Sequence, residues 1–569
     1  MTDLRLYHDA TKHSSESVRS GHHFLDWGTK PFPFKVYPDA PAVPLPRELG
    51  RPTMPALEAV ARGAPARGGG ALDVARLAEI LFFAAGLTKK KVYPGGEGTH
   101  FRAAASTGAL YEVEVYVVAG SLAGLAPGVY HFCPGDFTLR CLRAGDYRSA
   151  LAEMTSQPAR VGEAPATVVL SAIYWRNTWK YQARAFRHFF WDSGTMLANL
   201  LATAAAADLP AGVLLGFADA PVNHLLGLDT AREAALAVVP LGAGARPAPT
   251  PTLEGAGASI EPLTLQTVPL SSREVDYPLV REAHVASSLP SGAAARDWAR
   301  PGSPRETGGA SPPVDHRLAP LDAPPRATLG DVILRRGSTR QFGREAIPFG
   351  ALSTILDVAV HDLEQGGLDI GAGGVSLVDC YLLVHAVDGL PAGAYVYDPG
   401  QRGLRLLRPG DFRSEGGYLC LEQAIGADAS AVVFFLADLG ALLEMYGNRG
   451  YRAANLAAGL LGGRMYLAAY ALGLGASGLT FYDDDVVRFF SPDATRKDAI
   501  FVTALGRPHR AGPPRGLGQV AGEVRSLGPG ESKAPPTPGW PDPDAGDSRS
   551  ARRCRGRGRS PRPPGTARA

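Results

Sequence analysis

The sequence predicts an α+β protein built from two copies of one domain, and three observations support this. Short phrases return 265 residues later: Gly124–Tyr130 as Gly389–Tyr395, and Arg143–Arg148 as Arg408–Arg413. Residues 111–118 alternate between apolar and polar side chains, which is typical of a half-buried strand. Residues 195–207 and 456–475 are apolar or small nearly all round, which predicts helices buried on both sides.

Single residues keep the same offset of 265: Tyr116 returns as Tyr381, and Tyr181, Arg184 and Arg187 return as Tyr446, Arg449 and Arg452. A constant offset over a long stretch is hard to obtain by chance, so we infer an internal duplication. Two copies in one chain predict an intramolecular pseudo-dimer with an interface like that of a homodimer. The two apolar helices would suit the seam between the copies, although ordinary core helices explain them equally well.

Composition divides the chain into five parts. Spaced aromatics and prolines predict an irregular arm at the start of the chain, and Pro-rich stretches predict an irregular linker in the middle. The last part is rich in Pro, Gly and Arg, which predicts a disordered tail. The predicted parts are an arm over residues 1–60, a first domain over 61–245, a linker over 246–326, a second domain over 327–510 and a tail over 511–569.

Charge and cysteine usage exclude several classes. The formal net charge is only +3 over 569 residues and no basic stripe carries interleaved aromatics, so we expect no nucleic-acid partner. Five cysteines without a CxxC pair fit a reducing compartment. The most apolar segment, 193–207, is too short to cross a bilayer of about 30 Å. Paired histidines such as His8 and His13 lack a carboxylate or thiol cluster, so we expect no metal. These features predict a cytoplasmic protein that contacts no membrane.

Residues 335–340 contain a candidate phosphate grip. If the chain is extended there, Arg336, Ser338 and Arg340 point to one face. Two guanidinium forks and a hydroxyl suit the terminal phosphate of a mononucleotide, and Gly337 lets a ligand approach the backbone closely. The same short motif, taken alone, also fits a solvated linker segment.

The two copies differ in complementary ways. Aligning residues 80–81 with 355–356 places small or apolar residues opposite the phosphate grip: Ala61, Gly63 and Pro65. Conversely, a small-residue loop of the first half, with Arg102 and Ser106, falls opposite Gly367 and Gly371. Each half keeps what the other has lost. This pattern is expected if one composite site across the interface is retained and its symmetry mate has decayed.

The chain resembles the FMN-dependent nitroreductase superfamily and, within it, the SagB/ThcOx-type dehydrogenases. The resemblance covers residues 1–245 and 327–510 and rests on five motifs. These are Arg336-x-Ser338-x-Arg340 with Phe342, the C-terminal Leu505–Pro508, the loop Ala105–Tyr111 with Ala105 in place of the family's proline, the flavin-covering segment Gly478–Asp483, and the opening Tyr7–His13.

This resemblance implies two nitroreductase-like domains, each with a mainly antiparallel central sheet flanked by helices, and FMN held at their interface. It implies that one half supplies the phosphate motif and a C-terminal basic residue, while the other supplies the serine loop. The cofactor-binding residues implied are Arg336, Ser338, Arg340, Arg507, Arg102, Ser106, Gly108, Leu479 and Thr480.

The dehydrogenase branch uses a Lys-Tyr pair, which Lys180 and Tyr181 resemble; the second copy has Met445 and Tyr446 instead. Branch members oxidise thiazolines or oxazolines in a modified peptide to azoles, removing a Cα proton and a hydride. Lys180 and Tyr181 are therefore candidate acid and base groups, and Lys180 needs partial desolvation to be neutral near pH 7. A surface lysine beside a core tyrosine would give the same pattern.

Three functions remain open. The first is an FMN-dependent dehydrogenase of peptide azolines. The second is a generic flavin oxidoreductase that passes electrons from NAD(P)H to nitro compounds or quinones. The third is a non-catalytic scaffold within a peptide-maturation complex, a reading to which Ala105 and Gly337 give weight. The corresponding partners are a peptide or small-molecule substrate and the maturation complex.

Overall fold

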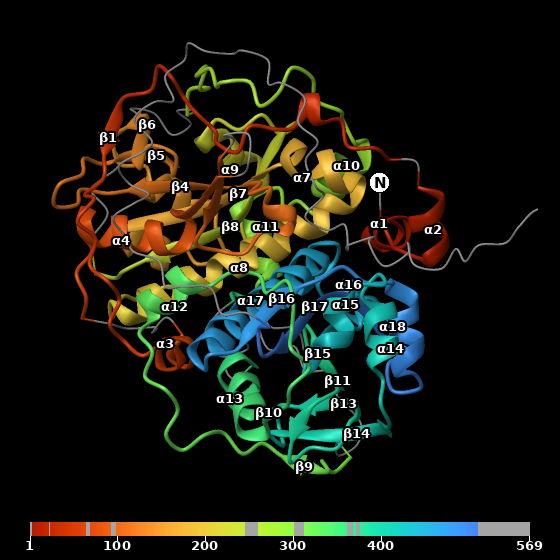
Figure 1. Cartoon of the computed structure of the whole chain (residues 1–569). Helices are drawn as coiled ribbons and strands as arrows, with labels where there is room; N and C mark the ends of the chain where they lie inside the picture. The colour runs from red at the N-terminus through yellow and green to blue at the C-terminus, as the bar shows by residue number, and fades with distance from the viewer. Residues whose placement is uncertain are drawn as a thin grey trace, which may run out of the picture.

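The computed structural model describes residues 3–21, 23–63, 69–92, 98–244, 260–300, 312–360, 368–370 and 376–509. The predicted tail, from residue 511, lies outside these residues. Figure 1 shows the two halves of the chain as two sheet-containing bodies, with the long helices α8 (Ala185–Ala206) and α17 (Arg449–Ala471) between them. The predicted α+β pseudo-dimer is therefore confirmed.

Each half has one antiparallel sheet as its core. The first sheet has the strand order β1-β6-β5-β4-β7-β8, and the second has the order β16-β17-β15-β11-β13-β14-β9. The first contains β1 (Ala42–Pro44), β4 (Val113–Ala119), β5 (Gly128–Cys133), β6 (Thr138–Ala144), β7 (Ala166–Ile173) and β8 (Glu233–Leu241). The second contains β9 (His316–Arg317), β11 (Asp379–Val384), β13 (Gly393–Asp398), β14 (Gly403–Pro409), β15 (Ala431–Ala437), β16 (Gly475–Gly478) and β17 (Asp498–Gly506). The strand predicted at 111–118 is β4, which begins two residues later.

Helices flank both sheets. The first half has α3 (Ala56–Arg62), α4 (Val74–Ala85), α5 (Arg148–Glu153), α6 (Pro158–Glu163), α7 (Tyr174–Tyr181) and α9 (Asp219–Leu226). The second has α12 (Leu329–Arg335), α13 (Phe349–Val360), α14 (Arg413–Leu419), α15 (Ala424–Asp428), α16 (Leu439–Tyr446) and α18 (Asp483–Phe490). Two small pairings are β2 (Leu87–Val92) with β3 (Gly98–Arg102) and β10 (Ile347–Pro348) with β12 (Val387–Asp388). The bounds of α7 and α16, and of β8 and β17, differ by 265 at both ends, which confirms the duplication.

The seam between the halves is a close crossing of α8 and α17. A Cβ added to Gly194 would overlap the backbone N of Leu460, and one added to Gly459 would lie 2.6 Å from the Cα of Trp191. Glycines at the crossing let the two backbones approach to a distance that larger side chains would prevent. The apolar helices of the sequence are therefore seam helices, as one of the two predicted readings had it.

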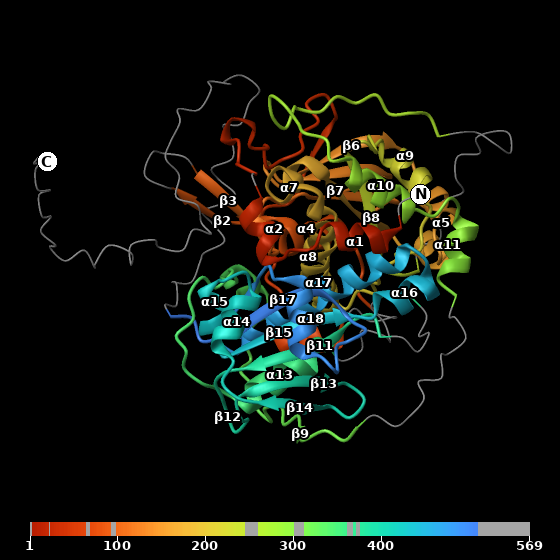
Figure 2. The same cartoon turned by 90° about the vertical axis from the view of Figure 1, so that its right-hand side faces the viewer.

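The arm and the linker are less irregular than predicted. The arm contains α1 (Leu4–Ala10), α2 (Ser15–Ser20) and a short 3₁₀ helix, η1 (Trp27–Thr29), and the linker contains α10 (Pro278–Ala286) and α11 (Gly292–Trp298). Figure 2 shows α1 and α2 along the boundary between the halves. Helices of six to nine residues show too few turns for a clear apolar period, so tertiary contacts decide their formation.

Helices α1 and α10 occupy equivalent places. The Nη2 of Arg187 donates to the carbonyl of His8 at the end of α1 at 2.6 Å, and the Nη2 of Arg452 donates to the carbonyl of His284 in α10 at 2.8 Å. The duplicated unit thus includes the helix that precedes each domain. No helix in the described part of the chain is long and apolar enough to cross a membrane.

Candidate functional site at the seam

The phosphate motif of the second half touches the serine loop of the first. Arg336 follows the last residue of α12, and its side chain crosses the seam, where it is only 8% exposed. Its Nε donates to the carbonyl of Ala103 at 2.9 Å and its Nη2 to the carbonyl of Arg102 at 3.3 Å. The two segments that the sequence predicts to form one composite site therefore meet.

Ser338 and Gly337 lie beside the flavin-covering segment. The Ser338 Oγ is 3.1 Å from the Tyr466 Oη, and that oxygen accepts a hydrogen bond from the backbone N–H of Gly478 at 2.6 Å. A Cβ added to Gly337 would meet only the Tyr470 hydroxyl, at 3.9 Å, so the backbone of the motif is open on that side. This open backbone next to a hydroxyl and a guanidinium is a donor set that suits a phosphate.

Arg340 and Arg507 lie on adjacent segments at the exposed edge of the second half. Phe342 and Pro508 form an antiparallel bridge, which places the two arginine-bearing segments side by side. The Arg507 Nε donates to the carbonyl of Ala346 at 3.1 Å. Both arginine side chains are exposed, so they add positive charge to the rim of the seam.

The serine loop is fixed by hydrogen bonds to the Asp192 side chain of α8. The Ser106 Oγ donates to Asp192 at 2.7 Å, and both the backbone N–H and the hydroxyl of Thr107 donate to the same carboxylate at 2.7 Å. Gly108 has a φ of +61°, and Tyr111 has a φ of +53°, a left-handed conformation that costs energy for a bulky residue. Strained backbone of this kind is concentrated at functional sites.

A second buried carboxyl group, Glu112, shares a hydrogen bond with Asp192. Burial raises the pKa of Glu112 well above its ordinary range, and the nearby charge of Asp192 raises it further. The Glu112 Oε1 has no hydrogen-bond partner in the described residues. Burial and the proximity of the two carboxyl groups therefore favour a proton shared by the pair.

The polar network continues to Asn177 and His188. The Oδ1 of Asn177 is 2.8 Å from the Nδ1 of His188, and both side chains are fully or nearly fully buried. None of the sequence motifs points to this network, although the offset of 265 contains a signal for it. The counterparts of Glu112, Asn177, His188 and Asp192 in the second half are all apolar: Leu377, Leu442, Ala453 and Ala457.

Lys180 and Tyr181 end α7 beside the serine loop. A Cβ added to Gly108 would lie 2.9 Å from the Tyr181 hydroxyl, so this oxygen packs directly on the loop glycine. The Tyr181 ring meets the His188 ring edge-on at 4.6 Å, and the Lys180 Nζ lies 5.4 Å from the centre of the Tyr181 ring. Both side chains are half-buried and so remain partly accessible.

The predicted flavin-covering segment reaches the same helix. Leu479 is buried, and the hydroxyl of Thr480 accepts a hydrogen bond from the Gln423 side chain at 3.3 Å. The next residue, Phe481, lies 6.2 Å from the ring of Trp191 and 5.2 Å from the guanidinium of Arg184. Helix α8 thus positions the serine loop through Asp192 and contacts the covering segment through Trp191.

Arg102 is placed differently from the other predicted residues. Its side chain is 2% exposed, and it donates to the carbonyls of Val113 at 3.0 Å and Pro33 at 2.8 Å. The guanidinium also lies 5.4 Å from the centre of the Tyr111 ring. These contacts use the Arg102 side chain inside its own half, where it fixes the loop; its carbonyl is the group that faces Arg336.

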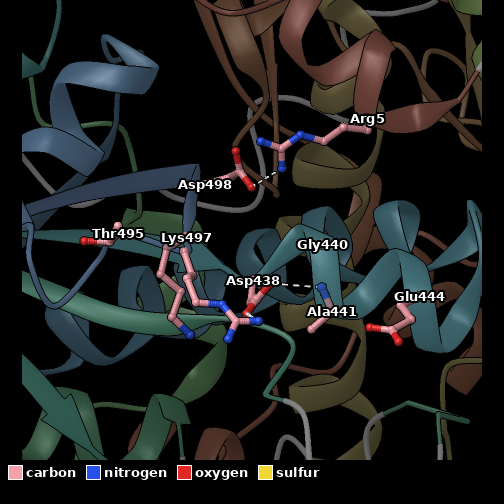
Figure 3. A pocket seen from close by; sticks show the side chains of 9 residues that line it. Arg5, Asp438, Gly440, Ala441, Glu444, Thr495, Lys497 and Asp498 are labelled. Atoms are coloured by element: carbon pink, nitrogen blue, oxygen red, sulfur yellow. Dashed lines mark hydrogen bonds and ion pairs between the residues drawn. The ribbon is translucent and has the colours of Figure 1, made fainter.

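A separate polar hollow of about 300 Å³ lies between the arm and the second half (Figure 3). Its lining residues bond to one another: the Arg5 side chain donates to Asp498 at 2.6 Å, and the Asp438 side chain accepts from the backbone N–H of Ala441 at 2.9 Å. None of the predicted site residues lines it.

A family model of the nitroreductases matches residues 71–243 and 333–492, which together make up more than half of the chain. The chain belongs to the nitroreductase family. Members of this family are oxidoreductases and generally use flavin cofactors. One matched region lies within each sheet-containing half, so each half contains a nitroreductase domain.

A solved structure described as a nitroreductase, from Anabaena variabilis, is 29% identical, with a TM-score of 0.67. The alignment covers 89% of this chain and 99% of that one, so the tandem arrangement is common to both. A Methanocaldococcus jannaschii protein named as a nitroreductase is 28% identical over 161 residues, which are 28% of this chain and 81% of that protein. The E. coli microcin synthetase complex McbBCD with truncated pro-MccB17 is 20% identical, with a TM-score of 0.28, over 42% of this chain and 91% of that one. A likeness this weak carries no argument about function.

Proposed function

We propose that this nitroreductase-family chain binds FMN at the seam and acts as a dehydrogenase. The observation that carries the proposal is the contact of Arg336 with the carbonyls of Arg102 and Ala103, since it joins the phosphate motif of one half to the serine loop of the other. The residues present fit the cofactor. Ser338, the open backbone at Gly337 and the cationic rim can hold a phosphate.

The loop side of the seam supplies a wall for the flavin ring. Ser106 and Thr107 are fixed by Asp192, and Gly108 presents backbone without a side chain at the point where Tyr181 packs. When bound there, FMN supplies a two-electron acceptor that takes a hydride. The residues of the chain then have to bind the substrate, exclude water and accept the accompanying proton.

The substrate we propose is a thiazoline or oxazoline ring in a ribosomally made peptide. Oxidation to the azole removes one hydride and one proton, so the ring loses two electrons and two hydrogens. Tyr181 lies against the loop, Lys180 lies over its ring, and both are half-buried, which suits a group that takes the Cα proton. This choice rests on the Lys-Tyr resemblance, and a generic NAD(P)H-dependent reductase is the competing function.

The test uses the purified full chain. We expect a yellow protein with absorbance near about 450 nm, and oxidation of a heterocycle-containing peptide, without NAD(P)H, that lowers its mass by about 2 Da per ring. Reduction of nitro compounds or quinones by NAD(P)H with no peptide oxidation would favour the generic reductase. A colourless chain that does not take up added FMN would leave only a scaffold role.

A further inference from the structure

The interface between the halves has two equivalent regions, one on each side of the pseudo-two-fold axis, and we call each region a seam. Only one of them contains the candidate site. In the other, which we call the mate seam, residues 213–216 are the counterparts of 477–480, because the bridge of Leu214 to Val238 matches that of Gly478 to Thr503. Residues 368–370 stand at the offset of 265 from 103–105, at the start of the small-residue loop that carries Ser106. The two seams can therefore be compared segment by segment.

In the mate seam the two segments are joined. Leu368 and Val213 form a parallel β-bridge, and the N–H of Asp369 donates to the carbonyl of Val213 at 3.0 Å. In the candidate site, no hydrogen bond joins residues 103–105 to 477–480 in the part of the chain that the structure describes. One seam is therefore bridged where the other is not.

The side chain of Asp369 completes the closure. Its carboxylate accepts hydrogen bonds from the backbone N–H of Leu215 at 2.6 Å and of Gly216 at 2.9 Å, and from the hydroxyl of Ser156 at 2.5 Å. The residue is 7% exposed. The Asp369 carboxylate accepts three hydrogen bonds and has almost no contact with water, so it occupies this place as a bound anion would.

One of the two equivalent donors in the candidate site has no protein acceptor. The counterparts of Leu215 and Gly216 are Leu479 and Thr480: the N–H of Leu479 donates to the carbonyl of Val502 at 3.3 Å, whereas no acceptor for the N–H of Thr480 is present among the described residues. A backbone donor without an acceptor is costly unless water or a ligand meets it. The candidate seam thus keeps a place for an acceptor that Asp369 takes in the mate seam.

The mate seam has a glycine where the phosphate grip has Arg336. Helix α12 ends at Arg335 and is followed by Arg336, whereas α3 ends at Arg62 and is followed by Gly63. The structure therefore aligns Gly63 with Arg336, two positions away from the predicted pairing of Gly63 with Ser338. In either pairing the first half has no arginine where Arg336 stands.

We propose that the chain holds a single flavin, because the mate seam is closed by Asp369, which acts as an internal ligand in place of a second cofactor. This inference rests on the proposed flavin site. Under this proposal only one of the two seams binds flavin: the first half supplies the serine loop and the second half supplies the phosphate motif. In the mate seam, where these roles would be exchanged, Asp369 occupies the site.

Two measurements test the closure. The first is the flavin content of the full chain saturated with FMN, from flavin absorbance after denaturation and protein mass from amino-acid analysis. One flavin per chain is expected. Two per chain would overturn the inference, whereas none would overturn the proposed function. Ser338→Asp, which places a negative charge in the phosphate grip, should remove all bound flavin; retention of half would reveal a second site.

The second measurement does not depend on flavin. In Asp369→Ala, amide hydrogen exchange at Leu215 and Gly216 should accelerate at least about tenfold, while exchange in β15 stays unchanged. Asp388→Ala, at an exposed position in the same half, is the matched control. Unchanged exchange at both amides in Asp369→Ala would show that this carboxylate does not hold the seam closed.

Discussion

Asp483 lies 2.6 Å from Arg187 across the seam, and the same pair recurs with the halves exchanged, as Asp219 and Arg452 at 2.7 Å. All four side chains are at most 2% exposed. Asp219 is the first residue of α9, and Asp483 is the first residue of the corresponding helix, α18. Each arginine lies in the first turn of the seam helix of the other half. This reciprocity is what an isologous dimer interface shows, here within one chain.

Loss of Asp483 should destabilise the chain strongly. Asp483→Ala would leave Arg184 and Arg187 buried without their counter-ion, which typically costs about 3–5 kcal/mol. Denaturant unfolding monitored by tryptophan fluorescence measures the free energy of unfolding. In Asp276→Ala, which breaks an exposed ion pair with Arg281, the loss should stay below about 1 kcal/mol.

The pH dependence of the same variant gives a further check. Burial acts to raise the pKa of Asp483, but Arg184 and Arg187 outweigh it and hold that pKa below its ordinary value. The stabilisation is therefore complete above the unfolded pKa of about 3.9 and is lost as pH falls below it. Wild type and Asp483→Ala should converge in acid; a constant difference down to pH 2 would contradict this origin.

Glu112→Gln should flatten the pH dependence of stability. Because burial raises the pKa of Glu112, the folded chain binds a proton that the unfolded chain releases above about pH 4.3. Stability should then fall as pH rises from that value toward the raised folded pKa, by up to about 1.4 kcal/mol per pH unit. The glutamine mimics the protonated acid and should remove this slope.

The measurement is the free energy of unfolding between pH 5 and 7, with Glu58→Gln on the exposed face of α3 as the control. Glu112→Gln should also be at least as stable as wild type at pH 7. Equal slopes in the wild type and the variant would mean that Glu112 is ionised in the folded chain.

Gly459→Ala should weaken the crossing of α8 and α17. The added Cβ would lie 2.6 Å from the Cα of Trp191, and backbone atoms at a helix crossing cannot give way cheaply. We expect a loss of about 1–3 kcal/mol in the free energy of unfolding. Gly440→Ala in α16 is the matched control, since its Cβ would meet only the Asp438 side chain at 3.4 Å and alanine favours the helix. A stabilised Gly459→Ala would show that the helices do not touch there.

The sequence was sufficient to predict the duplication, the two nitroreductase domains and the contact of Arg336 with the loop that carries Ser106, because a constant offset between repeated residues can be read without the tertiary structure. It was not sufficient for Asp369, whose role depends on a β-bridge to Val213 more than 150 residues away. Arg102 was assigned by its neighbourhood in the loop, yet its side chain turns inward to Pro33 and Val113. Packing decides which way a side chain at the end of a strand points, so a sequence motif cannot predict it.

Arg336→Ala should weaken FMN more than riboflavin. A charged hydrogen-bonding group contributes about 1.5–3 kcal/mol, so the Kd for FMN should rise about ten- to a hundredfold. Riboflavin lacks the phosphate and should bind nearly as before. Arg335→Ala is the matched control, because that exposed neighbour donates to the carbonyl of Tyr470. Arg336 also braces the serine loop through Ala103, so an equal loss for both ligands would assign it that bracing role alone.

Lys180→Met should stop turnover while flavin stays bound. The substitution copies Met445, the counterpart in the half that lacks the serine loop, so the helix end should accept it. Removal of a proton-transferring group typically lowers kcat about 10²–10⁴-fold. Flavin content and its visible spectrum should not change, because the Lys180 Nζ lies over the Tyr181 ring and not at the phosphate motif. Tyr181→Phe keeps the ring against His188 and removes only the hydroxyl, so it separates the two groups. If Lys180→Met retains full activity while Tyr181→Phe loses it, the tyrosine alone handles the proton; if both retain it, neither residue takes part in the chemistry.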